Sequence, residues 1–225
     1  MTSTSSTPAS ASPASDIHWA DPARQQAFGI WLAAQASRHG VQPDSLRSAS
    51  ADASFRRYFR VDAPTAPRGT LIIMDAPPEK EDCHPFVAVA RLLEAGGVGV
   101  PHILEWDEAQ GFMLLSDLGQ HTFLATLEAT DYDHGPASRN RALYMSAIDE
   151  LVRLQAVPAD SLPSYDDALL QRELDLLPEW YLTQLRGVSL DDATRTMLAQ
   201  TFALIKAEAL AQPTGFVHRD YHSRN

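Results

Sequence analysis

A short polar stretch near residue 220 contains side chains whose types and spacing could act together in a reaction. An apolar, strand-like run at 215–217 precedes it, and Asp220 is followed five places later by Asn225. A carboxylate in such a loop can orient an attacking hydroxyl and accept its proton, and an amide oxygen can help to hold the Mg²⁺ that neutralises phosphate groups. The spacing His218-x-Asp220-x-x-x-x-Asn225 is a demanding pattern, and the alternative is a polar surface turn. We therefore take Asp220 as a candidate catalytic base and Asn225 as a candidate metal ligand.

The residue two places after Asp220 helps to indicate which class of proteins this loop resembles. Protein kinases usually carry a lysine there, whereas this sequence has His222. The pattern His-x-Asp-x-His-x-x-Asn resembles the aminoglycoside phosphotransferase and choline kinase family, which phosphorylates small molecules. The stretches 54–61 (SFRRYFRV), 74–78 (MDAPP) and 164–170 (SYDDALL) resemble, more narrowly, the bacterial N-acetylmuramate/N-acetylglucosamine anomeric kinases of cell-wall recycling. The resemblance covers about residues 40–225.

This resemblance implies a reaction, a substrate and cofactors. It implies transfer of phosphate from ATP, with Mg²⁺, to a sugar hydroxyl, namely the anomeric hydroxyl of N-acetylmuramate or N-acetylglucosamine. Phosphoryl transfer also rests on the residues of the loop, whereas the substrate rests on analogy alone. Two alternatives remain open: a kinase for an aminoglycoside or another alcohol, and a pseudokinase that binds nucleotide without catalysis.

Composition limits the other classes of function. The chain has 225 residues, of which 44% are hydrophobic and 21% charged, as in ordinary globular proteins. A net charge of -11 repels nucleic acid and anionic membranes, so we expect a small-molecule partner and neither of those two. The single cysteine, Cys83, cannot form an internal disulfide, which fits the cytoplasm. The sequence leaves the oligomeric state open.

The first elements along the chain follow from local signals. Residues 1–16 are Ser, Thr, Ala and Pro, too polar to bury a core, and we expect a disordered tail. Asp21 and Pro22 are typical of a helix start, and Gly40 is typical of a helix end. The small polar residues from position 48 then lead into an alternating strand that ends at Val61.

Kinases cover the nucleotide phosphates with a hairpin loop at this place. The usual glycines are missing here, but Ser54 and backbone amides such as that of Phe55 can donate hydrogen bonds to phosphate, and Arg56 or Arg57 can supply positive charge. The alternative is a solvated strand face with scattered arginines.

The next strand, at 70–74, departs from the kinase pattern. Its end normally carries a lysine that pairs with a helix glutamate and contacts the phosphates. Met74 and Asp75 stand there instead, and the helix expected at 83–95 begins with apolar residues where the glutamate would lie. Lys80, Arg56 or Arg57 could replace the charge, and the sequence does not choose among them.

Two further strands are expected at 98–106 and 111–115. The segment 113–119 resembles the hinge between kinase lobes, where backbone groups pair with the adenine edge. This implies nucleotide contacts at Met113 and Leu115. An ordinary core strand ending in a glycine turn is compatible with the same residues.

Helices are expected at 121–129, 136–156, 165–186 and 190–211, the last with a capping box formed by Ser189 and Asp192. The third is rich in acidic and aromatic residues, which suit a sugar because carboxylates accept hydrogen bonds from hydroxyls. The candidate substrate contacts are Asp117, Glu173, Glu179 and His222. For most acidic residues of this helix a solvated face is the default interpretation.

Together these elements predict an α+β, protein-kinase-like fold with two lobes. Residues 17–115 would form the N-lobe, and residues 116–225 the front part of a helical C-lobe that ends at the catalytic loop. A kinase needs a further Mg²⁺-binding aspartate after that loop. We therefore expect the sequence to be the front part of a longer, C-terminally truncated protein, and residues 1–225 alone to be inactive.

Overall fold

The computed structural model describes residues 17–51, 55–127 and 138–224. The chain forms two compact units. The first comprises the chain up to Arg153 together with the segment from Asp220, and the second comprises Leu154–Arg219.

Helix α1, Pro22–His39, begins and ends where the sequence predicts. The Asp21 side chain accepts a hydrogen bond from the Ala23 N–H at 2.9 Å, which satisfies one of the N–H groups that a helix start leaves unpaired. Gly40 adopts φ 65° and donates its N–H to the Ala36 carbonyl. This left-handed conformation closes the helix and suits glycine.

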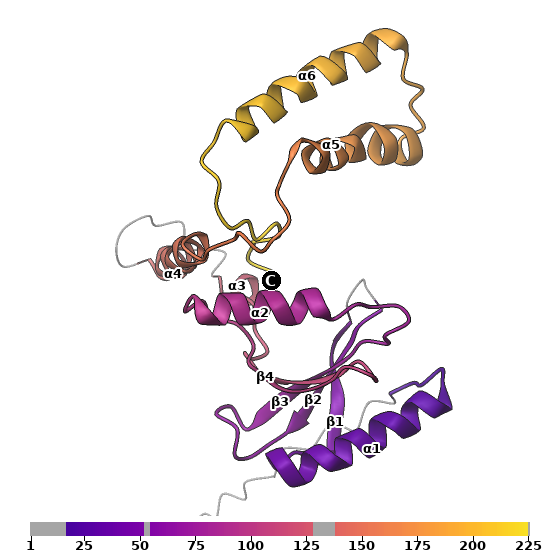
Figure 1. Ribbon diagram of the computed structural model, residues 1–225, viewed down its shortest axis with the longest axis vertical. Coiled ribbons are helices and arrows are strands. Elements are labelled where there is room, and N and C mark those ends of the chain that lie inside the picture. Colours follow the sequence, from indigo (N-terminus) through magenta and orange to yellow (C-terminus); the bar gives the residue numbers. More distant parts are fainter. Residues whose placement is uncertain (1–16, 52–54, 128–137, 225) are drawn as a thin grey trace, which may run out of the picture. The chain divides into compact units, whose positions relative to one another are not determined.

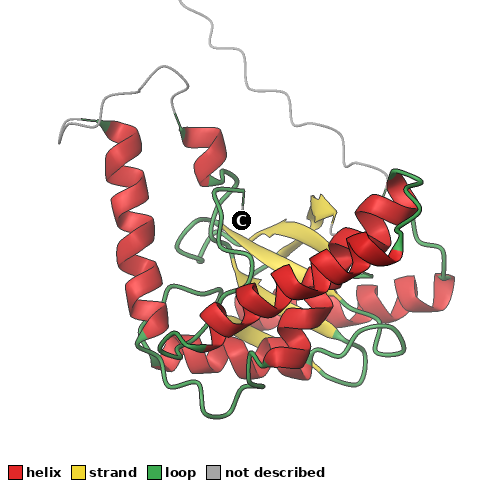
Figure 2. Ribbon diagram, turned by 90° about the horizontal axis from the view of Figure 1, so that it is seen from above, coloured by secondary structure: helices red, strands yellow, loops and turns green. Residues whose placement is uncertain are grey.

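A five-stranded antiparallel sheet follows, in the order β1-β2-β3-β5-β4 (Figures 1 and 2). Its strands are β1 (Gln42–Ala51), β2 (Arg57–Asp62), β3 (Thr70–Asp75), β4 (Ile103–Asp107) and β5 (Phe112–Ser116). The strands expected up to Val61, at 70–74 and at 111–115 are present with bounds shifted by one or two residues. Strand β1 was not expected, because its small polar residues lack an apolar pattern. Residues 98–102 lie outside β4, so the predicted start of that strand was too early.

Each face of the sheet packs against one helix, because successive strand residues point to opposite faces. On one face Phe28 and Leu32 of α1 pack with Phe59, Ile73 and Leu114. On the other face Val87 of α2 (His84–Ala95) shares a cluster with the buried side chains of Met74, Met113 and Leu115. Figure 1 shows α1 and α2 on opposite sides of the strands. This layering decides which side chains reach which face of the sheet.

The first unit also contains α3 (Phe123–Thr126) and α4 (Arg139–Gln155), whose last two residues belong to the second unit. Helix α3 is shorter than expected: Leu127, in extended conformation, follows it, and residues 128 and 129 lie outside the described residues. Among the described residues, no helix combines the length and the apolar character that crossing a membrane requires.

The second unit contains α5 (Asp167–Leu176), a π-helical segment η1 (Leu177–Leu185) and α6 (Asp192–Leu210). The single helix predicted at 165–186 therefore changes its hydrogen-bonding pattern at Leu177, next to Pro178, which has no N–H to donate. The predicted capping box of α6 was wrong, because the Asp191 side chain caps the helix and accepts the Thr194 N–H at 2.8 Å.

The run at 215–217 is not a strand in the structure, although Phe216 is buried. An apolar run alone does not make a strand, since a strand needs a partner for its backbone groups.

Candidate active site

Asp220 follows a residue with unusual backbone geometry. Arg219 has φ 73°, and within the described part of the chain it is the single residue other than glycine with positive φ. Side chains with a Cβ disfavour this conformation, so surrounding contacts must hold it. One such contact lies within the second unit, where Arg219 Nη2 donates to Glu173 Oε1 at 2.8 Å. Glu173, predicted to contact substrate, thus fixes the side chain that precedes Asp220.

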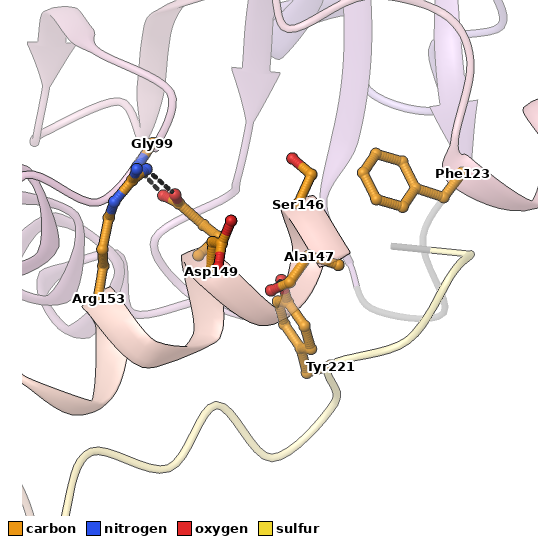
Figure 3. A pocket seen from close by; sticks show the side chains of 8 residues that line it. Gly99, Phe123, Ser146, Ala147, Asp149, Arg153 and Tyr221 are labelled. Atoms are coloured by element: carbon orange, nitrogen blue, oxygen red, sulfur yellow. Dashed lines mark hydrogen bonds and ion pairs between the residues drawn. The ribbon is translucent and has the colours of Figure 1, made fainter. Parts of the chain in front are cut away.

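The residues after Asp220 are anchored to α3 and α4 within the first unit. The Tyr221 hydroxyl donates to the Ala147 carbonyl at 2.6 Å, and the Leu124 N–H donates to the Ser223 carbonyl at 2.8 Å. Figure 3 shows Tyr221 beside Ala147 of α4. Burial, followed by the charge of Glu150, raises the pKa of Tyr221, so the phenol keeps the proton that it donates. Sequence reasoning missed Tyr221, and the signal that could have indicated it is an aromatic residue inside a polar loop.

The Asp220 carboxylate is exposed and faces a histidine. Of its side chain, 71% is accessible, and Oδ1 lies 3.2 Å from His222 Nε2. The Arg224 N–H donates to His222 Nδ1 at 3.1 Å. Because Nδ1 accepts that hydrogen bond, the proton of a neutral His222 is on Nε2, where it can be donated to Asp220. The structure thus brings together two of the predicted residues, and His222 orients the carboxylate.

A pocket of about 380 Å³ lies beside the Tyr221 side chain (Figure 3). Glu150 lines this pocket, and its carboxylate accepts hydrogen bonds from the Gly99 N–H at 2.6 Å and from Arg153 Nη1 at 2.7 Å. The hydrogen bond from the Gly99 backbone is the main cause that lowers the pKa of Glu150. None of the described residues predicted to form the site lines this pocket, so it is separate from the Asp220 carboxylate.

Arg57 does not take the position predicted for a phosphate contact. Its Nε donates to Asp75 Oδ2 at 2.9 Å, and its guanidinium carbon lies 3.9 Å from the centroid of the Trp19 ring. Arg24 of α1 donates to the other oxygen of Asp75 at 2.8 Å. Because Asp75 is completely buried, it requires these two cations. Arg57 therefore stabilises the face that carries α1, and the predicted phosphate contact is not supported.

Phe55 and Arg56, by contrast, share a partner near the start of α2. Glu81 accepts the Phe55 N–H at 3.0 Å through Oε1 and the Arg56 Nε–H at 3.2 Å through Oε2. Glu81 was not among the predicted residues, since it precedes the helix in which a paired glutamate was sought. Ser54, the remaining predicted phosphate donor, lies outside the described residues.

Met113 and Leu115 lie inside the sheet. Strand β5 pairs with β3 on one side and β4 on the other, and both side chains are buried against the α2 cluster. Backbone groups engaged in two ladders cannot also pair with adenine, so that part of the prediction does not fit. Backbone that could pair with a base begins after Ser116, near the exposed Leu118.

Asp117, predicted to contact substrate, is instead surrounded by donors from its own lobe. Oδ2 accepts from Arg60 Nε at 2.5 Å and from the Thr70 hydroxyl at 2.6 Å, and Oδ1 accepts the Gly119 N–H at 2.8 Å. Burial acts to raise the pKa of Asp117, but these hydrogen bonds outweigh it and lower the pKa to about 2. The geometry therefore gives Asp117 a structural role.

Two predicted site residues remain, one in the second unit and one outside the described residues. Glu179 is exposed on η1 in the second unit, and Asn225 lies outside the described residues. Within the described ranges, no three His, Cys, Asp or Glu side chains gather as a metal site would require.

Comparison with known proteins assigns the chain to a family. The model of the phosphotransferase enzyme family matches residues 45–225, which is most of the chain. The chain belongs to the phosphotransferase enzyme family. This membership confirms the resemblance drawn from the loop around Asp220, and the antiparallel sheet with its helices agrees with the fold expected for the family.

Several curated members of this family bear the name N-acetylmuramate/N-acetylglucosamine kinase. That of Pseudomonas aeruginosa is 45% identical, over 91% of this chain and 60% of its own length. Those of Pseudomonas putida and Caulobacter vibrioides are 45% and 32% identical, over 82% and 86% of this chain and 52% and 60% of their own lengths. The chain thus spans between half and two thirds of the length of these relatives.

Although the chain belongs to the phosphotransferase enzyme family, its strand β3 lacks the lysine that kinases usually carry at the end of this strand. Met74 lies at the end of β3 with no exposed surface, and it faces α2. A cation there would need a buried partner. Any charge that meets the phosphates has to come from another element.

Proposed function

We propose that the full-length protein is a kinase that transfers the γ-phosphoryl group of ATP to the anomeric hydroxyl of N-acetylmuramate or N-acetylglucosamine. The observation that carries the phosphoryl transfer is the exposed Asp220 carboxylate beside His222, in a loop anchored through Tyr221. The names of relatives that are up to 45% identical support the choice of amino sugar.

In the proposed reaction Asp220 orients the sugar hydroxyl and accepts its proton. The hydroxyl oxygen forms a bond to the γ-phosphorus, the bond between that phosphorus and the β–γ bridging oxygen breaks, and ADP leaves. His222 Nε2 lies 3.2 Å from the carboxylate oxygen Oδ1. In the proposed reaction this contact leaves Oδ2 to accept the proton of the hydroxyl. Most of the rate gain would come from positioning and charge neutralisation, as is general for this chemistry.

The proposed cofactors follow from the donor types. Asn225 offers an amide oxygen, a donor that suits Mg²⁺, and the ion would supply neutralisation of the phosphate charge. We propose that the segment from Ser54 to Arg56 covers the phosphates. The Phe55 N–H does not take part as predicted, because it donates to Glu81. Adenine would meet backbone after Ser116, near the exposed Leu118. Glu179 remains a candidate for sugar contact.

Substitution of Asp220 by Asn in the full-length protein tests this function. We expect kcat for sugar phosphorylation to fall by about 10²- to 10⁴-fold, because general base catalysis is lost. The KM for ATP should change little, since the carboxylate does not hold the base or ribose. The readout is ³²P transfer from γ-labelled ATP to each amino sugar.

A matched control is Asp62→Asn, which removes a half-buried carboxylate that pairs with Arg47 in the sheet. This variant should keep its kcat. If Asp220→Asn retains near-normal kcat while folded, Asp220 is not the base and the proposed mechanism is wrong.

A further inference from the structure

The phosphates of ATP need a cation, and the usual source of that cation is absent. The chain carries a net charge of -11, which by itself repels a triphosphate. Met74 fills the lysine position at the end of β3 and is fully buried. Three cations near this part of the fold could replace the lysine: Arg56, Arg57 and Lys80.

The two arginines contact opposite faces of the sheet. Tyr58 pairs with Met74 across β2 and β3, and both pack in the cluster on the α2 face. Arg56 precedes β2, and its side chain is placed on that same face by its hydrogen bonds to Tyr58 and to Glu81, which lies shortly before α2. Arg57 pairs with Asp75 and faces α1, where Asp75 and Trp19 hold its guanidinium. Of the two arginines, Arg56 is thus the one on the face where Met74 replaces the lysine.

Lys80 is also near this face, but it is held less firmly. It is exposed, and its Nζ lies 5.1 Å from the centroid of the Phe55 ring. Arg56 is more buried, with 24% of its side chain exposed, and it donates to Glu81, whose side chain is 14% exposed. A partly buried Arg–carboxylate pair fixes the cation in place, as the Lys–Glu pair does in kinases.

The environment also keeps Arg56 charged. Burial acts to lower the pKa of Arg56, but its hydrogen bond to Tyr58 and the charge of Glu81 outweigh burial and raise the pKa. Glu81 accepts the Nε–H and Tyr58 shares a further hydrogen bond with the guanidinium, which has more N–H donors than these two bonds use. Those donors lie in the planar fork that matches phosphate oxygens.

We infer that Arg56, held by Glu81, binds the β- and γ-phosphates of ATP in place of the missing strand lysine. The inference rests on the proposed function, because it names the cation of that same nucleotide site. Glu81 is then a positioning residue with two effects. It orients the guanidinium, and through the Phe55 N–H it ties the start of β2 to the segment that leads into α2.

The test compares nucleotide affinities of the full-length protein and three variants, Arg56→Gln, Arg57→Gln and Lys80→Gln. ATP, ADP and adenosine are titrated by calorimetry, and melting temperatures report folding. Arg56→Gln should weaken ATP binding by about 10- to 100-fold, the loss expected for a charge-assisted hydrogen bond, and leave adenosine binding unchanged. Arg57→Gln should lower the melting temperature and leave the ratio of ATP to adenosine affinity unchanged.

Two further variants separate phosphate binding from a structural role. Arg56→Lys keeps the charge without the fork, and it should recover part of the ATP affinity. Glu81→Gln should raise the KM for ATP with a smaller change in kcat. Arg47→Gln, which breaks a half-buried Arg–Asp pair of the same sheet, is the matched control and should change neither the ATP affinity nor the KM for ATP.

The outcomes distinguish this inference from the proposed function. If the wild type binds ATP and phosphorylates an amino sugar but folded Arg56→Gln binds ATP as tightly, the inference is wrong and the function stands. A larger loss with Lys80→Gln than with Arg56→Gln also overturns it. An Arg56-dependent affinity for ATP without sugar phosphorylation supports the inference and refutes the sugar kinase. Absence of ATP binding in the wild type refutes both.

Discussion

The carboxylate of Asp117 shows how one charged residue can join several parts of the N-terminal sheet. Arg60 of β2 and Thr70 of β3 both donate to it, and it accepts the N–H of Gly119 in the turn that follows. Its pKa of about 2 means that the folded state holds the ionised form more tightly than the unfolded chain does. Asp117 therefore contributes to stability, and its contribution depends on pH.

We predict that Asp117→Asn lowers the free energy of unfolding by about 2–4 kcal/mol at pH 7, because Arg60 keeps a buried charge without its partner. The pKa is depressed in the folded state, so the ionic contribution is fully present above the ordinary value of about 4. It disappears as the pH falls from about 4 to about 2. Urea unfolding of wild type and variant at several pH values measures the difference, which should narrow below pH 4. A gap that stays constant across this range would contradict the ionic origin.

At the residue scale, a sequence motif indicates a type of reaction more readily than it indicates which side chains contact one another. The Asp220 loop is recognisable because the reaction fixes residue types at a fixed spacing along the chain. Whether Arg56 or Arg57 reaches the α2 face depends on the register with β3, which no local pattern gives. Glu81 was missed for the same reason, since its pairing with Arg56 spans 25 positions in the sequence. Asp117 was misjudged because its donors come from two other strands.

At the scale of elements, the turn between β4 and β5 depends on a glycine. Gly111 adopts φ 69°, and its carbonyl accepts the Ala76 N–H at 2.9 Å, which joins the turn to the end of β3. A Cβ on Gly111 would lie 1.9 Å from the Ala76 carbonyl oxygen. Since that oxygen belongs to the backbone, the turn itself would have to move.

We predict that Gly111→Ala destabilises the sheet by at least about 3 kcal/mol, from backbone strain together with the clash. Gly69→Ala is the matched control: its φ is 71°, but nothing lies within 4 Å of the added Cβ. That variant should lose only about 1–2 kcal/mol, the cost of a left-handed conformation. Urea unfolding of both variants makes the comparison, and equal losses would show that the close approach to Ala76 is unimportant.

Elements with a clear local pattern were mostly predictable, whereas an element without such a pattern, formed through a partner strand, was not. Helix α1 was placed by Asp21 and Gly40, which cap their own helix. Strand β1 escaped prediction because its polar residues become a strand by pairing with β2. The run at 215–217 shows the reverse case, an apolar pattern that forms no strand. The cap of α6 was predicted at the wrong residue, because Ser189, Asp191 and Asp192 all carry side-chain oxygens that could accept the same hydrogen bond.

At the scale of the whole molecule, burial is distributed unevenly between the two units. In the first unit Ile73, Met74, Phe112, Met113 and Leu114 have no exposed surface. In the second unit α5 and η1 contain no buried residue, and α6 buries Phe202 alone among its residues. Large apolar side chains such as Trp180 and Leu204 are exposed there. Because apolar burial is the main source of stability, the first unit should be the more stable.

We predict that hydrogen exchange in the 225-residue chain is slowest in β3 and β5. These strands are central in the sheet and lie between two helix-covered faces, so their amides open only when the whole unit unfolds. The amides of α5 and α6 should exchange at least about 100-fold faster, through local openings that expose little additional apolar surface. Exchange followed by mass spectrometry of peptides covering 70–76, 112–117 and 192–210 measures this difference. Equally slow exchange of α6 would mean that its exposed apolar residues have partners in solution, and the two units would then unfold as one.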